Sequence, residues 1–472
     1  MLMHRIVPLI VAVALFMENM DSTVIATALP AIAADLQTNP LALKLAITSY
    51  LLALAIFIPA SGWTADRFGA RNVFRLAIAV FMTGSLGCAI AHSLDDFVVA
   101  RFVQGIGGAM MSPIGRLVLL RSFDKRELVK VMVWVTTPAL IGPMLGPPVG
   151  GFITTYFSWH WIFVINIPMG LIGIVLATRY IPDIRGEERV PFDFVGFVLA
   201  GLGIGGLAFG ATSIGIGYLP VEFVLAMLAI GMLAGVGYLI HSRRTATPLL
   251  DLTLFSLPTF SASVLGGFMF RVGVGALPFL LPLLLQLGFR MTPFQSGLIT
   301  FSTAIGAMSM KAVVPSILSR FGFRNTLVVN AVISAAFLAA CAAFTPATPV
   351  AVIIVVLVVG GFFRSLEFTC INTIAYADVD RRRMSRATSL VSVAQQLSIA
   401  TGVAVGALAV EVTTRHSEGT GIGAADFPPA FLLVGAISAA SALVFMRLAP
   451  DAGHELAGRT PGPTEPTDQR MG

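Results

Sequence analysis

Apolar runs of about 20 residues recur along almost the whole chain, and this feature limits most strongly what the chain can fold into, because a bilayer core is crossed by a helix of that length. Of the 472 residues, 56% are apolar and only 11% are charged. A soluble protein carries roughly 25% charged residues, so this chain lacks the charge needed for a water-facing surface. The sequence therefore predicts an integral membrane protein and excludes a soluble enzyme.

Fourteen of these runs are predicted to be transmembrane helices, which makes the expected fold class all-α integral membrane. The first run begins like a signal peptide, but Glu18 and Asp21 interrupt it, so an uncleaved first helix is expected. The expected spans are 6–30, 43–64, 73–92, 97–119, 128–154, 160–180, 194–214, 219–240, 258–287, 294–318, 325–345, 349–376, 387–412 and 428–448.

The basic residues test the orientation of these spans. Of the 30 Lys and Arg residues, 22 fall on one side, three (Lys44, Arg290 and Arg415) on the other, and five within spans. Because cytoplasmic loops carry the excess of Lys and Arg, both termini are predicted to be cytoplasmic. The expected location is the cytoplasmic (inner) membrane of a bacterium.

A short repeat indicates two related halves. Residues 66–72 read DRFGARN and residues 319–325 read SRFGFRN, so five of seven positions match at an offset of 253. Two six-helix bundles with two extra helices between them explain this repeat. The expected organisation is a first bundle at 1–181, linker loops and two extra helices at 182–254, a second bundle at 255–449 and a disordered cytoplasmic tail at 450–472.

Several motifs carry a family resemblance. Residues 21–30 read DSTVIATALP, 62–71 GWTADRFGAR, 101–108 RFVQGIGG, 142–151 GPMLGPPVGG and 159–168 WHWIFVINIP. Together they resemble the major facilitator superfamily, and within it the fourteen-spanner drug:proton antiporter branch. Thr64, Ala70, Asn72 and Ser319 depart from the usual loop pattern.

The fifth span carries the antiporter motif, with Gly142, Pro143, Gly146, Pro147, Gly150 and Gly151. Glycines four residues apart share one helix face and let a neighbouring helix approach closely, while each proline removes a backbone donor and can bend the helix. The resemblance implies a close seam between the halves that controls which side opens. A helix that serves only packing is the alternative.

The loop after the second span is a candidate gate. It contains Gly62, Asp66, Arg67, Gly69 and Arg71. The resemblance implies that it acts as a latch, which holds the inward side closed in one state. A solvated charged turn is the alternative.

Ionisable residues within spans are costly and by default indicate a transport path or a proton relay. Counting along the first and fourth spans places Asp21 about 13 Å and Arg101 about 6–8 Å below the outer surface. The Arg101 side chain can close most of that gap, provided that these two helices face each other, as the resemblance implies. We therefore expect Asp21 to be the proton switch with Arg101 as its partner, and Glu18 to be a second carrier or a counter-charge for cargo. A permanent ion pair that only holds two helices together is the alternative for Asp21.

A second buried acid, Glu367, is expected to bind a proton or line the cargo cavity. Arg364 lies three residues away on the same helix, so a static Arg364–Glu367 pair is the alternative. The other residues expected to line the cavity are Met17, Gln104, Arg271, Phe363 and Arg364.

These features predict a proton-coupled secondary transporter that exports amphiphilic or cationic compounds by alternating access. The sequence has no phosphate-binding G-x-x-x-x-G-K-[ST] motif, so the proton gradient, not ATP hydrolysis by this chain, is the expected energy source. No cofactor, no metal, no nucleic-acid partner and a monomeric state are expected. One alternative is the same fold with another cargo, such as a lipid, siderophore or metabolite. The other, a membrane-embedded enzyme, would need a catalytic cluster, and the sequence offers none.

Overall fold

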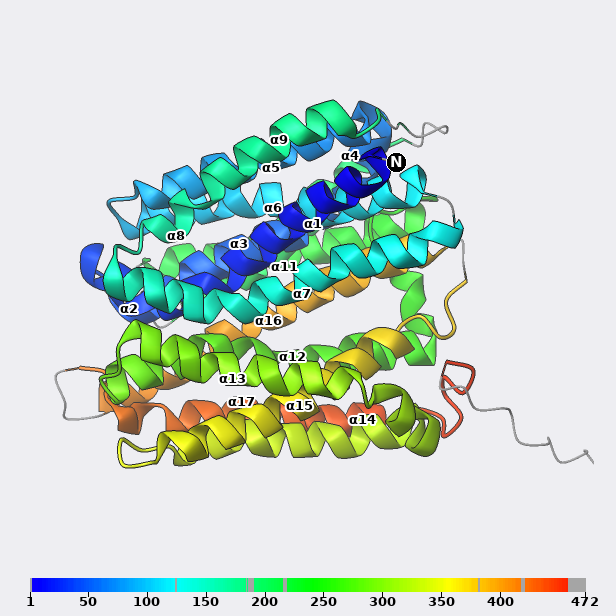
Figure 1. The fold of residues 1–472 in the computed structure, drawn as a ribbon. Coiled ribbons are helices and arrows are strands. Elements are labelled where there is room, and N and C mark those ends of the chain that lie inside the picture. Colours follow the sequence, from blue (N-terminus) through cyan, green and yellow to red (C-terminus); the bar gives the residue numbers. More distant parts are fainter. Residues whose placement is uncertain are drawn as a thin grey trace, which may run out of the picture.

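Long helices lying side by side form the described part of the chain (Figure 1). The computed structural model describes residues 2–123, 125–183, 185, 191–214, 219–380, 383–416 and 421–456, and these contain no strand. The expected tail at 450–472 lies outside the described residues from 457 onward. The prediction of an all-helical protein is confirmed for the part of the chain described.

The first group of helices precedes residue 181. Short 3₁₀ turns join some of its members and extend their spans. The group contains α1 (Leu2–Val24), α2 (Leu29–Asp35), α3 (Lys44–Phe57), α4 (Ser61–Phe68), α5 (Ala70–Ala89), α6 (Leu94–Ser122), α7 (Lys125–Tyr156), α8 (Trp161–Val164) and α9 (Asn166–Tyr180).

An inserted helix pair, α10 (Phe194–Ser213) and α11 (Val221–Arg244), separates this group from the second group. The second group contains α12 (Pro258–Leu283), α13 (Pro293–Lys311), α14 (Val314–Ala340), α15 (Val350–Ile374), α16 (Met384–His416) and α17 (Pro428–Phe445). Within the described ranges, 12 segments are long and apolar enough to cross a membrane, and α7 and α13 are not among them.

Polar side chains at the starts of several helices explain where those helices begin. The Ser93 hydroxyl accepts a hydrogen bond from the Asp96 backbone N–H at the start of α6. At the start of α13, Thr292 and Gln295 satisfy each other's backbone N–H groups. Such caps use the backbone donors that a first helical turn leaves unpaired.

The repeat seen in the sequence also appears in the backbone. Gly69, between α4 and α5, has φ of +88°, and Gly322, inside α14, has φ of +74°. These glycines lie 253 residues apart, and a positive φ suits glycine because it has no Cβ. Each one kinks the chain after an eight-residue helical piece, so the span expected at 294–318 consists of α13 and the first turns of α14.

One hydrophobic core cluster joins the two groups at one end, and a smaller one nearer the other end joins Ala55 of α3 to Leu390 of α16. A single cluster contains Leu43 and Phe163 from the first group and Leu281 and Phe431 from the second. At the end where α1 begins and α17 ends (Figure 1), the cluster around Phe74, which also includes Ala400 of α16, is separate from the cluster around Phe323 in the second group. We call the end with the larger shared cluster the closed end and the other the terminal end.

Candidate functional site

Asp21 on α1 and Arg101 on α6 form a buried ion pair. The Arg101 guanidinium donates to Asp21 Oδ2 at 2.7 Å, and each residue is only 1% exposed. The guanidinium carbon also lies 4.3 Å from the centre of the Tyr50 ring, which is a cation–π distance. The pairing predicted from depth along the helices therefore has the expected geometry.

Neutral polar side chains complete a network around this pair. Gln104 accepts from Arg101 at 2.6 Å and donates to Asp21 Oδ1 at 2.9 Å. Asn166 on α9 donates to the same Oδ1 at 2.9 Å and to the Ser85 hydroxyl on α5 at 2.9 Å. Ser85 in turn donates to the Phe163 carbonyl at 3.0 Å. Side chains of α6 and α9 thus bond to the carboxylate on α1, Ser85 of α5 supports them, and each polar member is at most 1% exposed.

Glu18 lies one turn from Asp21 but has its own partner. The Ser112 hydroxyl on α6 donates to Glu18 Oε2 at 2.7 Å. Glu18 is half-buried, whereas Met17 beside it is 2% exposed and packs in the core of the first group. The expected cavity role of Met17 is thus not reflected in this structure, because its side chain is enclosed.

Glu367 on α15 is fully buried and has one hydrogen-bond partner in the described structure. Asn330 on α14 donates to Glu367 Oε2 at 2.8 Å, while Oε1 has no partner. The alternative of a static pair with Arg364 is wrong for this structure, because no ion pair between these two side chains exists among the described residues. Glu367 points to a neighbouring helix instead of along its own.

The other residues expected in the second half lie in different surroundings. Arg271 on α12 donates to Asn372 at 2.8 Å, lies 5.4 Å from the Phe368 ring centre and is 1% exposed. Phe363 stacks on Phe337 with ring centres 5.8 Å apart. No hydrogen bond or ion pair between described residues joins Arg271 or Glu367 to the Asp21 network.

The motif glycines of α7 pack mainly within the first group. A Cβ at Gly146 would lie 2.0 Å from Thr23 Oγ1, and one at Gly150 would lie 2.3 Å from the Val24 carbonyl oxygen. Gly142 likewise faces Phe16 and Met20 of α1, so the expectation that all these glycines line the seam between the halves is corrected. Gly151 does face the second group, since a Cβ there would lie 2.3 Å from the Pro293 carbonyl oxygen. The reason is helical geometry, because residues four apart share a face and Gly151 falls on the next one.

Pro147 and Pro143 belong to the same stretch of α7. The Pro147 carbonyl faces α13, where a Cβ at Gly297 would lie 2.3 Å from it. That carbonyl also accepts a hydrogen bond of 3.4 Å from Thr27 of the first group. Pro143 lies inside α7 without ending the helix. The contact between Pro147 and Gly297 therefore makes α7 and α13 the close seam between the groups.

The candidate gating loop lies at the terminal end, between α4 and α5. Arg121, at the end of α6, donates to Asp66 Oδ1 at 2.9 Å across a partly exposed pair. Gly62 and Arg67 are exposed, Gly69 adopts positive φ, and Arg71 is half-buried. Among the described residues, the ion pair of this loop is with its own group.

A cross-group ion pair at the closed end was not expected from the sequence. Lys44 is 0% exposed, and its Nζ lies 3.7 Å from Glu411 Oε2 on α16 and 3.4 Å from the Ile214 carbonyl oxygen. Sequence reasoning assigned Lys44 to an outward loop, because it borders a span. Glu411, an acidic residue near the end of an apolar span, is the sequence feature from which this pair could have been predicted.

Two carboxylates outside the spans border the inserted pair. Burial alone would raise the pKa of Asp193, but hydrogen bonds from His241, the Gly196 N–H and the Leu249 N–H outweigh it and lower that pKa. Burial likewise opposes ionisation of Asp251, yet hydrogen bonds from Thr253 and Arg383 and the charge of Arg383 hold its pKa below the usual value. Both groups are therefore ionised at neutral pH.

Ser85, Asn166 and Asn330 are the functional candidates that sequence reasoning missed. Asn166 lies inside a motif that carried the family resemblance, but neutral polar residues in a span give no charge signal. Among the described residues, no group of three or more His, Cys, Asp or Glu side chains could hold a metal ion. The groups that the site does offer, for proton exchange or for binding charged groups, are carboxyl, amide and guanidinium side chains.

Comparison with known families gives a match over nearly the whole chain. The model of the Major Facilitator Superfamily matches residues 11–266 and again residues 263–468. The two matches each take in about half of the chain.

Curated relatives and solved structures agree with that match. The chain is 39% identical over 447 residues to the putative multidrug resistance protein MdtD of Pectobacterium atrosepticum, covering 94% of this chain and 95% of that protein. It is 37% identical over 452 residues to the MdtD protein of Yersinia enterocolitica, with the same coverages of 94% and 95%. A D-xylose–proton symporter has a similar fold, with a TM-score of 0.67 and 16% identity over 95% of this chain and 98% of that one. The POT family transporter PepTSo gives a TM-score of 0.69 at 16% identity, over 93% of this chain and 97% of that one.

Proposed function

This chain belongs to the Major Facilitator Superfamily, a family of transporters and not of enzymes, and on that premise we propose that it exports amphiphilic or cationic compounds in exchange for protons. The relatives named multidrug resistance proteins support the cargo class. The observation that carries the proton coupling is the buried network around Asp21.

The coupling rests on a contact that a change of state can break. A carboxylate beside a guanidinium stays ionised, whereas one that loses this partner in a low-dielectric site takes up a proton. Asp21 is on α1 and Arg101 on α6, so a shift of α1 against α6 would separate them. Glu18, one turn away and half-buried, is a second proton carrier or the counter-charge for a cationic cargo.

The packing of the two ends supports alternating access. The larger shared core cluster lies at the closed end, with the Lys44–Glu411 pair nearby, whereas the terminal end is joined by a smaller cluster through Ala55 and Leu390. We assign the terminal end to the cytoplasm from the distribution of Lys and Arg, so the larger shared cluster lies toward the outside. In the outward-facing state, the loop with Asp66, Arg67 and Arg71 would close the cytoplasmic side.

Fourteen spans complete the proposed topology in the inner membrane. Twelve segments meet the length and composition of a membrane helix. We add α7, which has 32 residues, and α13, which has 19 and continues into the first turns of α14. Both run beside the other spans in Figure 1. With fourteen crossings, both termini lie on the same side, here the cytoplasm.

The deciding experiment uses the purified protein in liposomes that contain a pH-sensitive dye. When a lipophilic cation such as tetraphenylphosphonium is added, its transport should drive proton movement in the opposite direction. The rate of cation transport should depend on the pH gradient. Lys44→Met should leave cation binding in place and change the balance between inward- and outward-facing states. Cation transport that ignores the pH gradient would contradict the proposed coupling.

A further inference from the structure

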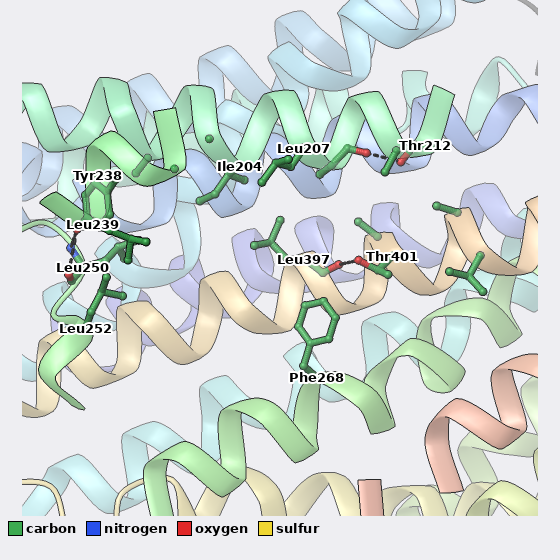
Figure 2. Close-up of a pocket in the computed structure, with 18 of the residues that line it drawn as sticks. Ile204, Leu207, Thr212, Tyr238, Leu239, Leu250, Leu252, Phe268, Leu397 and Thr401 are labelled. Carbon is green, nitrogen blue, oxygen red and sulfur yellow. Dashed lines mark hydrogen bonds between the residues drawn. The ribbon is translucent and has the colours of Figure 1, made fainter. Parts of the chain in front are cut away.

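A cavity of about 540 Å³ lies away from the Asp21 network, between the inserted helix pair and the second group. Figure 2 shows Ile204, Leu207 and Thr212 on α10 facing Leu397 and Thr401 on α16, with Phe268 of α12 reaching toward them. Tyr238 of α11 and Leu250 lie at the opposite end from Thr212. Nothing in the proposed transport mechanism uses this space.

The lining offers hydrophobic contacts almost exclusively, because its few polar groups are already bonded. The Thr212 hydroxyl donates to the Ala208 carbonyl at 2.7 Å, and the Thr401 hydroxyl donates to the Leu397 carbonyl at 2.8 Å. The Tyr238 hydroxyl donates to the Leu250 carbonyl at 2.9 Å and accepts from the Leu250 N–H at 2.7 Å. An occupant therefore needs apolar surface and no hydrogen-bonding groups in this part of the molecule.

The cavity is elongated along the helices and borders the lipid-facing surface. Its lining residues on α10 run from Ala200 to Thr212, which is about 18 Å at the helical rise per residue. One leaflet contributes about 15 Å of hydrocarbon to a bilayer. Leu207 and Leu239 line the cavity and are 41% and 48% exposed, so its edge is open to the surface that faces lipid. This shape matches one extended acyl chain of a single leaflet.

Positive charge lies at the end of the cavity nearer the cytoplasm. Arg243 follows Leu239 by four residues and so occupies the same face of α11, and Arg244 is next to it. Both side chains are exposed, and neither has an ion-pair partner among the described residues. Basic residues at the cytoplasmic interface attract anionic headgroups.

We propose that this cavity binds an acyl chain of an anionic phospholipid from the cytoplasmic leaflet, with the headgroup against Arg243 and Arg244. The lipid fills the space between α10 and α16 and links the inserted pair to the second group. Two observations support this proposal: the apolar cavity matches the length of an acyl chain in one leaflet, and the arginines at its end match the negative charge of the headgroup.

The test uses the full chain in nanodiscs that contain phosphatidylcholine and a small fraction of phosphatidylglycerol with a diazirine on one acyl chain. After illumination, mass spectrometry should place the label on peptides of α10 and α16. Arg243→Gln with Arg244→Gln should lower the labelling about tenfold, because each arginine near the surface contributes to binding an anionic lipid. Ala208→Phe, which fills the cavity, should lower it comparably.

A matched control separates filling the cavity from adding a large side chain to the inserted pair. Ala229→Phe places the same residue on an exposed face of α11 that does not line the cavity, and labelling should persist. Gel filtration checks that each variant is folded. If Ala208→Phe does not fold, the labelling of the Arg243→Gln, Arg244→Gln variant still tests the proposal. Equal labelling by a diazirine phosphatidylcholine, or label absent from α10 and α16, would overturn the proposal. Loss of label on adding tetraphenylphosphonium would identify a cargo site instead and would also overturn it.

Discussion

Asp21 in the first half and Glu367 in the second are both buried carboxyl groups on helices that cross the membrane, yet their surroundings differ. Asp21 accepts from Arg101, Gln104 and Asn166, so both of its oxygens are bonded and its charge is balanced. Among the described residues, Glu367 accepts only from Asn330, and one of its oxygens has no partner. A buried charge is stabilised by an ion pair and hydrogen bonds, and only the Asp21 site, of these two, has a cation beside its carboxyl group in the described structure.

If the proposed coupling holds, this difference gives the two halves different roles, although they share a repeat. In the first half, movement of α1 against α6 would create an unpaired charge, which makes Asp21 sensitive to the conformational state. In the second half, Glu367 has no cation to lose, so its protonation is less tied to that movement. The predictions below test this asymmetry from the largest expected effect to the smallest.

Asp21→Asn should abolish proton-driven efflux while cargo still binds. The amide preserves the size of the side chain but removes the charge that Arg101 balances, so no proton can be exchanged there. Efflux in everted vesicles should fall to the level of vesicles without the protein. Asp35→Asn is the control, because that side chain is 53% exposed. If a well-folded Asp21→Asn protein responds normally to the pH gradient, Asp21 is not the coupling site.

Gly146→Leu should cause loss of transport or a proton leak, with the protein still inserted in the membrane. A Cβ at Gly146 would already meet the side chain of Thr23 on α1, the helix that bears Asp21. The larger side chain therefore pushes α1 away from α7 and disturbs the Asp21 network. Gly173→Leu is the matched control, because a Cβ there meets its nearest atom at 3.5 Å.

The second half offers a parallel substitution that sharpens the comparison. A Cβ at Gly402 of α16 would lie 2.1 Å from the Val272 carbonyl oxygen on α12. Gly402→Leu should impair transport by mispacking, without the proton leak expected from Gly146→Leu. Equal leaks from both variants would show that the halves are alike in this respect.

Asp66→Asn should reduce efflux several-fold at normal protein level. Its ion pair with Arg121 is partly exposed, and such pairs contribute only about 0.2–1 kcal/mol to stability. A large loss of transport would therefore reflect the closing of the cytoplasmic side and not folding. Ser319, the corresponding residue of the second half, serves as the control, since Ser319→Ala removes no charge and should leave efflux nearly unchanged. Normal efflux by Asp66→Asn would refute the latch.

Glu367→Gln should have a smaller effect that depends on the cargo. Glutamine keeps an oxygen that can accept from Asn330, so the thermal stability of the protein should be unchanged. Efflux of a cationic dye should fall a few-fold, while the proton response to an uncharged cargo remains. Loss of all proton movement, as for Asp21→Asn, would break the comparison between the halves.

The sequence was a good guide to charges and a poor one to their neutral partners. Asp21 and Arg101 could be paired because ionised groups are rare in spans and depth along a helix can be counted. Ser85 and Asn166 could not be found, because a neutral polar residue in a span can also bond to its own helix. Arg364 was offered as a partner for Glu367 from helical spacing, but spacing says nothing about the neighbouring helix that supplies Asn330.

The same limit applies to the fold. Apolar runs predicted the helices, and the repeat predicted that the segments around Gly69 and Gly322 correspond, because both features are local. The kinks at these two glycines were not predicted. Which helix the α7 glycines contact depends on how the helices are arranged in space. Helical periodicity shows which glycines share a face, but not that Gly146 faces α1 and Gly151 faces α13.

The smallest effect is expected at Asp251, in the loop that joins the inserted pair to the second half. Its carboxylate accepts from Arg383 at 3.1 and 3.2 Å and from Thr253, and these contacts lower its pKa despite burial. A carboxyl group whose pKa is lower in the folded state adds stability that is complete above its unfolded pKa of about 3.9. That stability is lost as the pH falls through the folded pKa.

The thermal unfolding midpoint should therefore be insensitive to Asp251 ionisation from pH 7 down to about 5 and decline only in stronger acid. Asp251→Asn should lower the midpoint by a few degrees at pH 7 and reduce the difference between pH 7 and pH 3.5, as measured by scanning fluorimetry in detergent. An Asp251→Asn protein with the same midpoint and the same acid dependence would show that this loop does not hold the inserted pair to the second half.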